Sequence, residues 1–136
     1  MSVVLDASLA LTWCFEDERR EDTIAIGNRI LAQGATVPSL FHLEFANSML
    51  IAERRGRISK AQIDERLATI ALMPIAVDTA TFAVAWTGTL DLARAENLTV
   101  YDAAYLELAM RIGAELATLD GKLAEAALRR GLTVIP

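Results

Sequence analysis

Short apolar runs alternate with longer amphipathic stretches along the chain. Residues 3–6 form a β-branched run that ends in a polar residue, which is typical of a buried parallel strand. Four later runs have a similar pattern and are expected to be strands: residues 35–37, 73–77, 115–118 and 132–135. The expected strands are short, and each is bounded by Gly, Pro or a polar residue.

The stretches between these runs have helical periodicity and helix boundary signals. Ser39 is expected to cap a helix over residues 40–55. Ser59 with Gln62 makes a capping box for the next helix, and Asp78 or Thr79 is expected to cap a single helix that reaches residue 96. The full set of expected helices is residues 8–15, 21–33, 40–55, 60–72, 80–96, 100–112 and 121–130.

This order of elements predicts an α/β fold. Strands separated by helices favour a PIN-like three-layer arrangement, a short parallel sheet with helices on both faces. A length of 136 residues, without an internal repeat or a Gly/Ser linker, fits a single domain over residues 1–136.

Composition narrows the class of protein. The chain is 54% hydrophobic and 23% charged, which indicates a folded globular protein. Cys14 is the single cysteine, so neither an internal disulfide nor a Cys-based zinc site is expected. Without a signal peptide or a membrane-spanning run, we expect a cytoplasmic protein with no membrane partner. The net charge of −5 opposes a simple basic surface for nucleic acid, so any contact with nucleic acid would be local or metal-mediated.

Four acidic residues are the candidate chemical groups. Asp6 ends the first strand, and Asp120 follows the strand over residues 115–118, so both belong at the carboxyl edge of the sheet. Glu44 lies within an almost wholly apolar helix, where a carboxylate is costly unless it is paired or bound to a cation. Asn47, three residues later, shares its face. Asp102 opens a helix rich in alanine.

Each acid also has an ordinary structural explanation. Asp120 fits a helix N-cap, and Asp102 fits a capping box with Thr99. Asp6 could accept hydrogen bonds from the turn that follows it. Glu44 could belong to a solvated stripe or to a buried ion pair with one of the arginines Arg54, Arg94 and Arg111.

Other chemistry-bearing side chains carry weaker signals. Cys14 lies in an apolar stretch and is expected in the core, and His42 is expected to be structural or exposed. Tyr105 is expected to pack in the core or at an interface, with base stacking as the less frequent use of such a residue. If a basic residue flanks the acids and holds a nucleic-acid phosphate, we expect it to be Arg19 or Arg20.

Four motifs in order resemble the PIN domain family, and most closely the VapC-like toxins of type II toxin–antitoxin pairs. They are Val-Val-Leu-Asp-Ala-Ser at 3–8, Val-Pro-Ser-Leu-Phe-His-Leu-Glu-Phe-Ala-Asn at 37–47, Leu-Thr-Val-Tyr-Asp-Ala-Ala-Tyr at 98–105 and Leu-Ala-Thr-Leu-Asp at 116–120. The resemblance covers nearly the whole chain, and its matching positions are Asp6, Ser8, Glu44, Asn47, Asp102, Thr118 and Asp120.

The resemblance implies a metal-dependent endoribonuclease that cleaves RNA phosphodiester bonds. The four acids would be the catalytic and metal-binding residues for Mg²⁺ or Mn²⁺, with Glu44 as a ligand or as the group that orients the attacking water. Ser8, Asn47 and Thr118 would hold the carboxylates or metal waters by hydrogen bonds. The family also implies a homodimer and a cognate antitoxin whose tail, often with an arginine, enters the site.

Three alternatives remain open at this point. One is another acidic-site phosphoesterase or nuclease, although a nucleophilic-aspartate phosphatase would show D-x-D where this chain has Asp6-Ala7-Ser8. Another is a catalytically silent PIN-fold module that acts through protein partners. The last is a plain α/β domain whose acids only cap helices, a reading that leaves Glu44 unexplained.

Overall fold

The computed structural model describes residues 2–136 and has a five-stranded, fully parallel sheet at its centre. Its spatial order is β3-β2-β1-β4-β5, so the first strand is the middle one. The strands are β1 (Val3–Leu5), β2 (Ala35–Val37), β3 (Ile75–Val77), β4 (Glu115–Ala117) and β5 (Val134–Ile135). The predicted α/β class and parallel sheet are confirmed.

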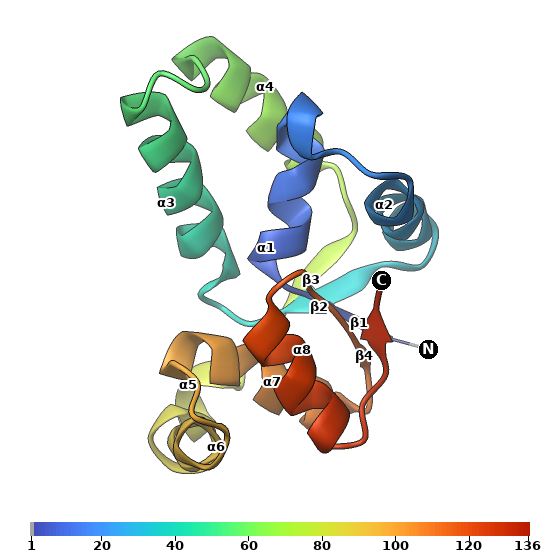
Figure 1. Ribbon diagram of the computed structural model, residues 1–136, viewed down its shortest axis with the longest axis vertical. Helices are drawn as coiled ribbons and strands as arrows, with labels where there is room; N and C mark the ends of the chain where they lie inside the picture. Colours follow the sequence, from blue (N-terminus) through green and yellow to red (C-terminus); the bar gives the residue numbers. More distant parts are fainter. Residues whose placement is uncertain (1) are drawn as a thin grey trace.

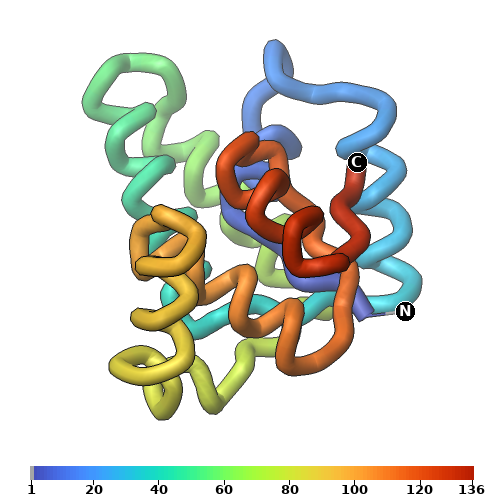
Figure 2. Tube along the Cα trace, turned by 60° about the horizontal axis from the view of Figure 1, so that its bottom comes forward, coloured from blue at the N-terminus to red at the C-terminus, as the bar shows by residue number. Residues whose placement is uncertain are grey.

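Helices cover both faces of this sheet (Figure 1). The first four lie on one side: α1 (Ala7–Ala10), α2 (Glu21–Gln33), α3 (Phe41–Arg54) and α4 (Lys60–Ala71). The other four lie on the opposite side: α5 (Thr81–Val84), α6 (Leu90–Glu96), α7 (Val100–Ile112) and α8 (Gly121–Arg129). Figure 2 shows α5 and α6, in yellow and gold, at a corner beside α7 and α8.

Most predicted helix starts are confirmed, and two are wrong. The Ser59 hydroxyl accepts the Gln62 N–H at 3.2 Å and the Gln62 side chain accepts the Ser59 N–H at 3.0 Å, a reciprocal capping box. Ser39 does not cap α3. The Phe41 N–H bonds to the Pro38 carbonyl at 3.1 Å, so residues 38–41 form a turn, and α3 begins at Phe41 with Leu40 as its N-cap.

The helix expected to follow Asp78 or Thr79 ends at Glu96 as predicted, but its predicted cap is wrong and it is not a regular α-helix throughout. It begins at Thr81, with Ala80 rather than Asp78 or Thr79 as its N-cap, and a π-helical segment over Ala85–Thr89 separates α5 from α6. The Asp78 carboxylate serves this region differently, because it accepts a hydrogen bond from the Thr81 hydroxyl at 2.8 Å. Asp78 therefore anchors the approach to the helix without capping it.

The core is continuous from the strands to α7. The side chains of β1 are at most 2% exposed, and Leu106, Leu108 and Leu116 are fully buried. Cys14 is buried as predicted, and burial raises the pKa of its thiol to about 11. None of the helices that the structure describes is both long and apolar enough to cross a membrane.

Candidate active site

The carboxyl ends of β1 and β4 meet at the point where the strand order reverses. Leu5 pairs with Ala117, and the Asp6 N–H bonds to the Ala117 carbonyl at 2.9 Å, so Asp6 lies beside the residue that follows β4. In an open parallel sheet this reversal point leaves a crevice between the connections that diverge from it. The sheet topology alone therefore places Asp6 at the position where such folds hold ligands.

Two hydroxyl groups fix the carboxylate of Asp6. Ser8 donates to Asp6 Oδ2 at 2.6 Å and Thr118 donates to the same oxygen at 2.7 Å. Both hydroxyls use one oxygen, so they orient the carboxylate without occupying Oδ1. Asp6 is buried, and this burial raises the pKa of its carboxyl against the lowering effect of the two hydroxyls.

The same hydroxyls connect Asp6 to Asp120. Ser8 Oγ accepts the Leu119 N–H at 3.1 Å, and Thr118 Oγ1 accepts the Asp120 N–H at 3.0 Å. Asp120 itself caps α8, because its Oδ1 accepts the Leu123 N–H at 3.0 Å. The ordinary N-cap explanation of Asp120 is therefore correct, and the cap leaves the second oxygen free of that bond.

Asp102 occupies the first turn of α7. Thr99 is the N-cap, and its hydroxyl accepts the Asp102 N–H at 3.1 Å. Burial is the main reason that the pKa of Asp102 is raised, and the negative charges of Asp120 and Asp6 raise it further. Asp102 is therefore near both of the acids that follow β1 and β4.

Glu44 completes the group from α3, on the other side of the sheet. Its Oε1 accepts a hydrogen bond from the Tyr105 hydroxyl at 2.7 Å. Burial raises the pKa of Glu44, and the charges of Asp6 and Asp102 raise it further, whereas the Tyr105 hydroxyl lowers it. The suggested ion pair with an arginine is wrong within residues 2–136, because Arg94 pairs with Asp91, Arg111 pairs with Asp78 and Glu107, and Arg54 is in none of the ion pairs.

Tyr105 also lines the site, although the sequence indicated only a position in the core or at an interface for it. It is fully buried, and burial together with the nearby Glu44 carboxylate raises its pKa far above the ordinary tyrosine value. The hydroxyl therefore stays protonated and donates to Glu44. The signal that could have identified it is its spacing, because Tyr105 is three residues after Asp102 and lies on the same face of α7.

Other expected residues take no part in this contact network. Asn47 is exposed and has no side-chain hydrogen bond to the part of the chain that the structure describes. Arg20 pairs with Asp22 at the start of α2. Arg19 lines a hollow between α2 and α4 that contains none of the four acids. The expectation that one of these arginines would flank the acidic site is therefore not supported by their contacts.

The four acids are an electrostatically coupled group. Asp120 raises the pKa of Asp6 and of Asp102, and Asp6 raises the pKa of Glu44. None of the ion pairs among residues 2–136 includes any of the four. The negative charge at this edge is therefore left without a basic side chain to offset it.

Comparison with known proteins agrees with this geometry. Residues 3–128 match the sequence profile of the PIN domain. The chain belongs to the PIN domain family. It is 32% identical over 125 residues to the protein named Ribonuclease VapC3 from Pyrobaculum aerophilum, an alignment that covers 92% of this chain and 94% of the relative.

Two solved structures share the fold of this PIN domain. The crystal structure of PAE2754 from Pyrobaculum aerophilum has a TM-score of 0.71 at 20% identity, covering 98% of this chain and 89% of that one. The crystal structure of FitAcB from Neisseria gonorrhoeae has a TM-score of 0.68 at 14% identity, covering 98% and 96%. The PIN-like architecture predicted from the sequence is confirmed.

The acidic edge of the PIN domain has the chemistry of a hard divalent-cation site. Its donors are carboxylate oxygens, which Mg²⁺ and Mn²⁺ prefer, and their mutual repulsion would be relieved by a cation. Within residues 2–136, no three side chains of His, Cys, Asp or Glu stand close enough together to enclose an ion directly. Because Mg²⁺ keeps several of its waters, ligation partly through water fits carboxylates spaced in this way.

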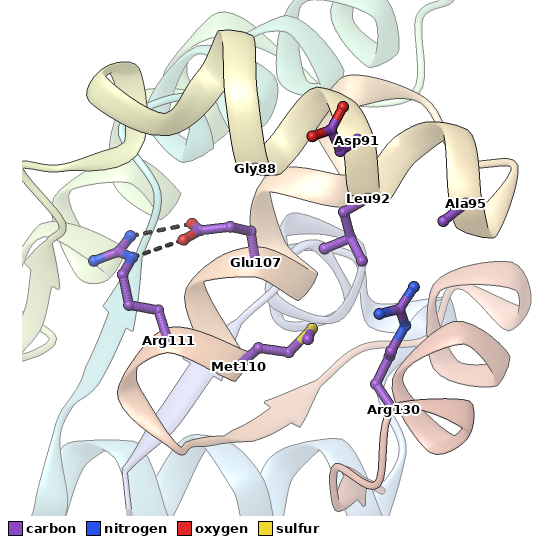
Figure 3. Close-up of a pocket in the computed structure, with 8 residues that line it drawn as sticks. All are labelled: Gly88, Asp91, Leu92, Ala95, Glu107, Met110, Arg111 and Arg130. Carbon is purple, nitrogen blue, oxygen red and sulfur yellow. Dashed lines mark hydrogen bonds and ion pairs between the residues drawn. The ribbon is translucent and has the colours of Figure 1, made fainter.

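A cavity of about 540 Å³ lies elsewhere, between α6, α7 and the end of α8 (Figure 3). It is lined by Gly88, Asp91, Leu92, Ala95, Glu107, Met110, Arg111 and Arg130. Its charged groups already have partners, since Arg111 bonds to Glu107 and Asp78 and Arg130 bonds to Glu96. None of the four acids lines it, so it is separate from the candidate active site.

Proposed function

We propose that this PIN domain is a metal-dependent endoribonuclease, the toxin component of a toxin–antitoxin pair. The observation that carries the proposal is the coupled set of Asp6, Glu44, Asp102 and Asp120 at the carboxyl edge of the sheet, without a basic partner. The 32% identity to a protein named as a ribonuclease supports the choice of RNA as substrate.

Asp6, Asp102 and Asp120 would hold a Mg²⁺ or Mn²⁺ ion directly or through water, and Glu44 would be a further ligand or orient the attacking water. A bound divalent ion would lower the pKa of water and polarise the scissile phosphate. The protein keeps the carboxylates ready for this role. Ser8 and Thr118 hold Asp6, and the cap of α8 holds Asp120.

Glu44 is suited to a place beside the cation. Its pKa is raised by burial and by the charges of Asp6 and Asp102, and a divalent ion would offset that accumulated negative charge. We assign to Glu44 a position next to the ion, as a ligand or as the group that holds one of the ion's waters.

We base the proposed partners on the negative charge of the four acids and on exposed apolar side chains. The unpaired acids would accept an arginine from the tail of an antitoxin, which would compete with the metal. Large apolar side chains are exposed outside the acidic edge, among them Trp86 at 91% and Phe82 at 78%. Such side chains are suited to a homodimer or antitoxin contact.

The test compares the wild-type protein with Asp6→Asn in two assays. Mn²⁺ or Mg²⁺ should raise the melting temperature of the wild type and not that of the variant, since a ligand specific to the folded state adds about 2.7 kcal/mol at one hundred times its dissociation constant. The wild type should also cut single-stranded RNA in a manner abolished by EDTA and by the substitution.

Matched controls separate the alternatives. A DNA strand of the same sequence and a phosphate monoester test whether the enzyme is a different acidic-site phosphoesterase. Metal binding without cleavage of any substrate would refute the nuclease assignment, and absence of both would favour a PIN-fold binding module. An Asp6→Asn variant that cuts RNA at the wild-type rate would overturn the site.

A further inference from the structure

The hydrogen bond between Tyr105 and Glu44 joins the two halves of the fold. Glu44 is on α3, which belongs to the helices on one side of the sheet, and Tyr105 is on α7 on the other side (Figure 1). Their hydroxyl and carboxylate oxygens are 2.7 Å apart, although 61 residues separate them in the chain. This bond ties the position of α3 to the helix that carries Asp102.

The Tyr105 hydroxyl is also close to the turn that carries Asp6. The backbone of Ala7 and the Asp6 charge both influence the pKa of this hydroxyl. Ala7 is the first residue of α1 and directly follows Asp6. The Tyr105 hydroxyl therefore lies near the chain between β1 and α1 and bonds to the carboxylate of α3.

Glu44 needs such an anchor. Its side chain has three rotatable bonds, and its neighbours Asp6 and Asp102 carry charges that repel it. The adjoining Leu43 and Asn47 are exposed, so solvent lies beside Glu44 on α3. A carboxylate in this position would turn toward water unless a fixed donor held it.

Tyr105 has the properties of that donor. Its side chain is fully buried and its ring is locked by packing, so the hydroxyl has a fixed position. It bonds to Glu44 Oε1 and leaves Oε2 outside this bond. The arrangement matches that of Asp6, whose Oδ2 takes both hydroxyl bonds.

We propose that Tyr105 is a positioning residue that holds Glu44 at the acidic edge, with Oε2 presented to the divalent cation. The inference rests on the proposed metal-dependent function and adds to it a residue outside the motif acids and their hydroxyl partners. Tyr105 acts through Glu44 and does not touch the ion. Its removal should therefore weaken metal binding only while Glu44 is present.

The experiment is a double-mutant cycle on Mn²⁺ affinity, measured by isothermal titration calorimetry of the whole chain. The variants are Tyr105→Phe, Glu44→Gln and the two combined. Tyr105→Phe should raise the dissociation constant about 10- to 100-fold, the usual cost of losing a group that holds a metal ligand. In the Glu44→Gln background the same change should alter it less than about twofold. Tyr101→Phe, one turn earlier on α7 and 65% exposed, is the matched control and should leave Mn²⁺ affinity unchanged.

The outcomes distinguish failure of this inference from failure of the proposed function. Equal losses from Tyr105→Phe in both backgrounds would show a purely structural role and overturn the proposal, as would wild-type affinity in the single variant. A wild-type protein that neither binds Mn²⁺ nor cuts RNA would refute the proposed function and this inference together. Circular dichroism and metal-free melting temperatures would establish that each variant is folded, so that a change in Mn²⁺ affinity is attributed only to folded variants.

Discussion

Replacing Thr118 by valine should harm the protein more than replacing it by serine, although valine better preserves its volume. Thr118 is 3% exposed, and its hydroxyl donates to Asp6 at 2.7 Å and accepts the Asp120 N–H at 3.0 Å. Valine removes both bonds. Serine keeps the hydroxyl and loses one methyl group.

The free-energy contributions of the hydroxyl and of the methyl group predict which substitution is more damaging. A hydrogen bond to a charged group contributes about 1.5–3 kcal/mol, and a partly buried amide left without a partner costs about 1 kcal/mol or more. Thr118→Val should therefore lower the free energy of unfolding by about 2–4 kcal/mol at pH 7. Thr118→Ser should lower it by about 1 kcal/mol, the transfer free energy of one methyl group.

Urea unfolding of the metal-free proteins measures both values. Because the hydroxyl stabilises the charged form of Asp6, the loss in Thr118→Val should be largest above the pKa of Asp6 and should shrink as acid protonates that group. RNA cleavage should follow the same order, with serine retaining most activity and valine little. If valine proves no more damaging than serine, packing and not the hydroxyl defines the position, and the account of how Asp6 is held is wrong.

Three further changes test separate parts of the structure. Because burial raises the folded-state pKa of Asp6, its charge destabilises the folded protein increasingly as pH rises from the unfolded-state pKa to the raised one. Asp6→Asn should therefore stabilise the metal-free protein at pH 7, and denaturant titrations should show that the gain vanishes below the unfolded-state pKa. Asp120→Asn should keep the cap on the Leu123 N–H, and with it nearly the full free energy of unfolding, but should lose RNA cleavage. Asp120→Ala should lose cleavage and also lower the free energy of unfolding by about 1 kcal/mol. A stable Asp120→Asn variant that still cuts RNA would show that Asp120 is only a helix cap. Gly27→Ala should lower the free energy of unfolding by about 1 kcal/mol and leave RNA cleavage intact. The added Cβ would lie 3.2 Å from the Trp13 ring, and the cost of this overpacking exceeds the gain in helix propensity. A more stable variant would show that Trp13 can move.

The sequence predicts the layer structure because short β-branched runs and amphipathic stretches have different periods. Helix starts were predictable where a side chain makes the cap, as at Ser59, Thr99 and Asp120. They failed where backbone turns set the start. The turn at Pro38 displaces Ser39 from α3, and a serine before a helix gives no sign of this.

The acids at the ends of strands were predictable from topology, because parallel strands share a carboxyl edge. Tyr105 was not, because a buried tyrosine in an alanine-rich helix looks like core until its hydroxyl partner is known. That partner is 61 residues away, on a helix whose placement depends on the whole sheet. Long-range polar contacts of this kind follow from the fold and carry no local signal.

The central position of β1 has a consequence for when the acidic edge can exist. Val3 pairs with Glu115, so the second side of β1 is filled only by a segment 112 residues further along. Closing so long a loop has a high entropic cost, and contacts of this range slow folding. A nascent chain that already contains Asp6 and Glu44 still lacks Thr118 to hold the first of them. The acidic edge is therefore incomplete until β4 pairs with β1, and partly synthesised chains carry separated carboxylates in place of a site.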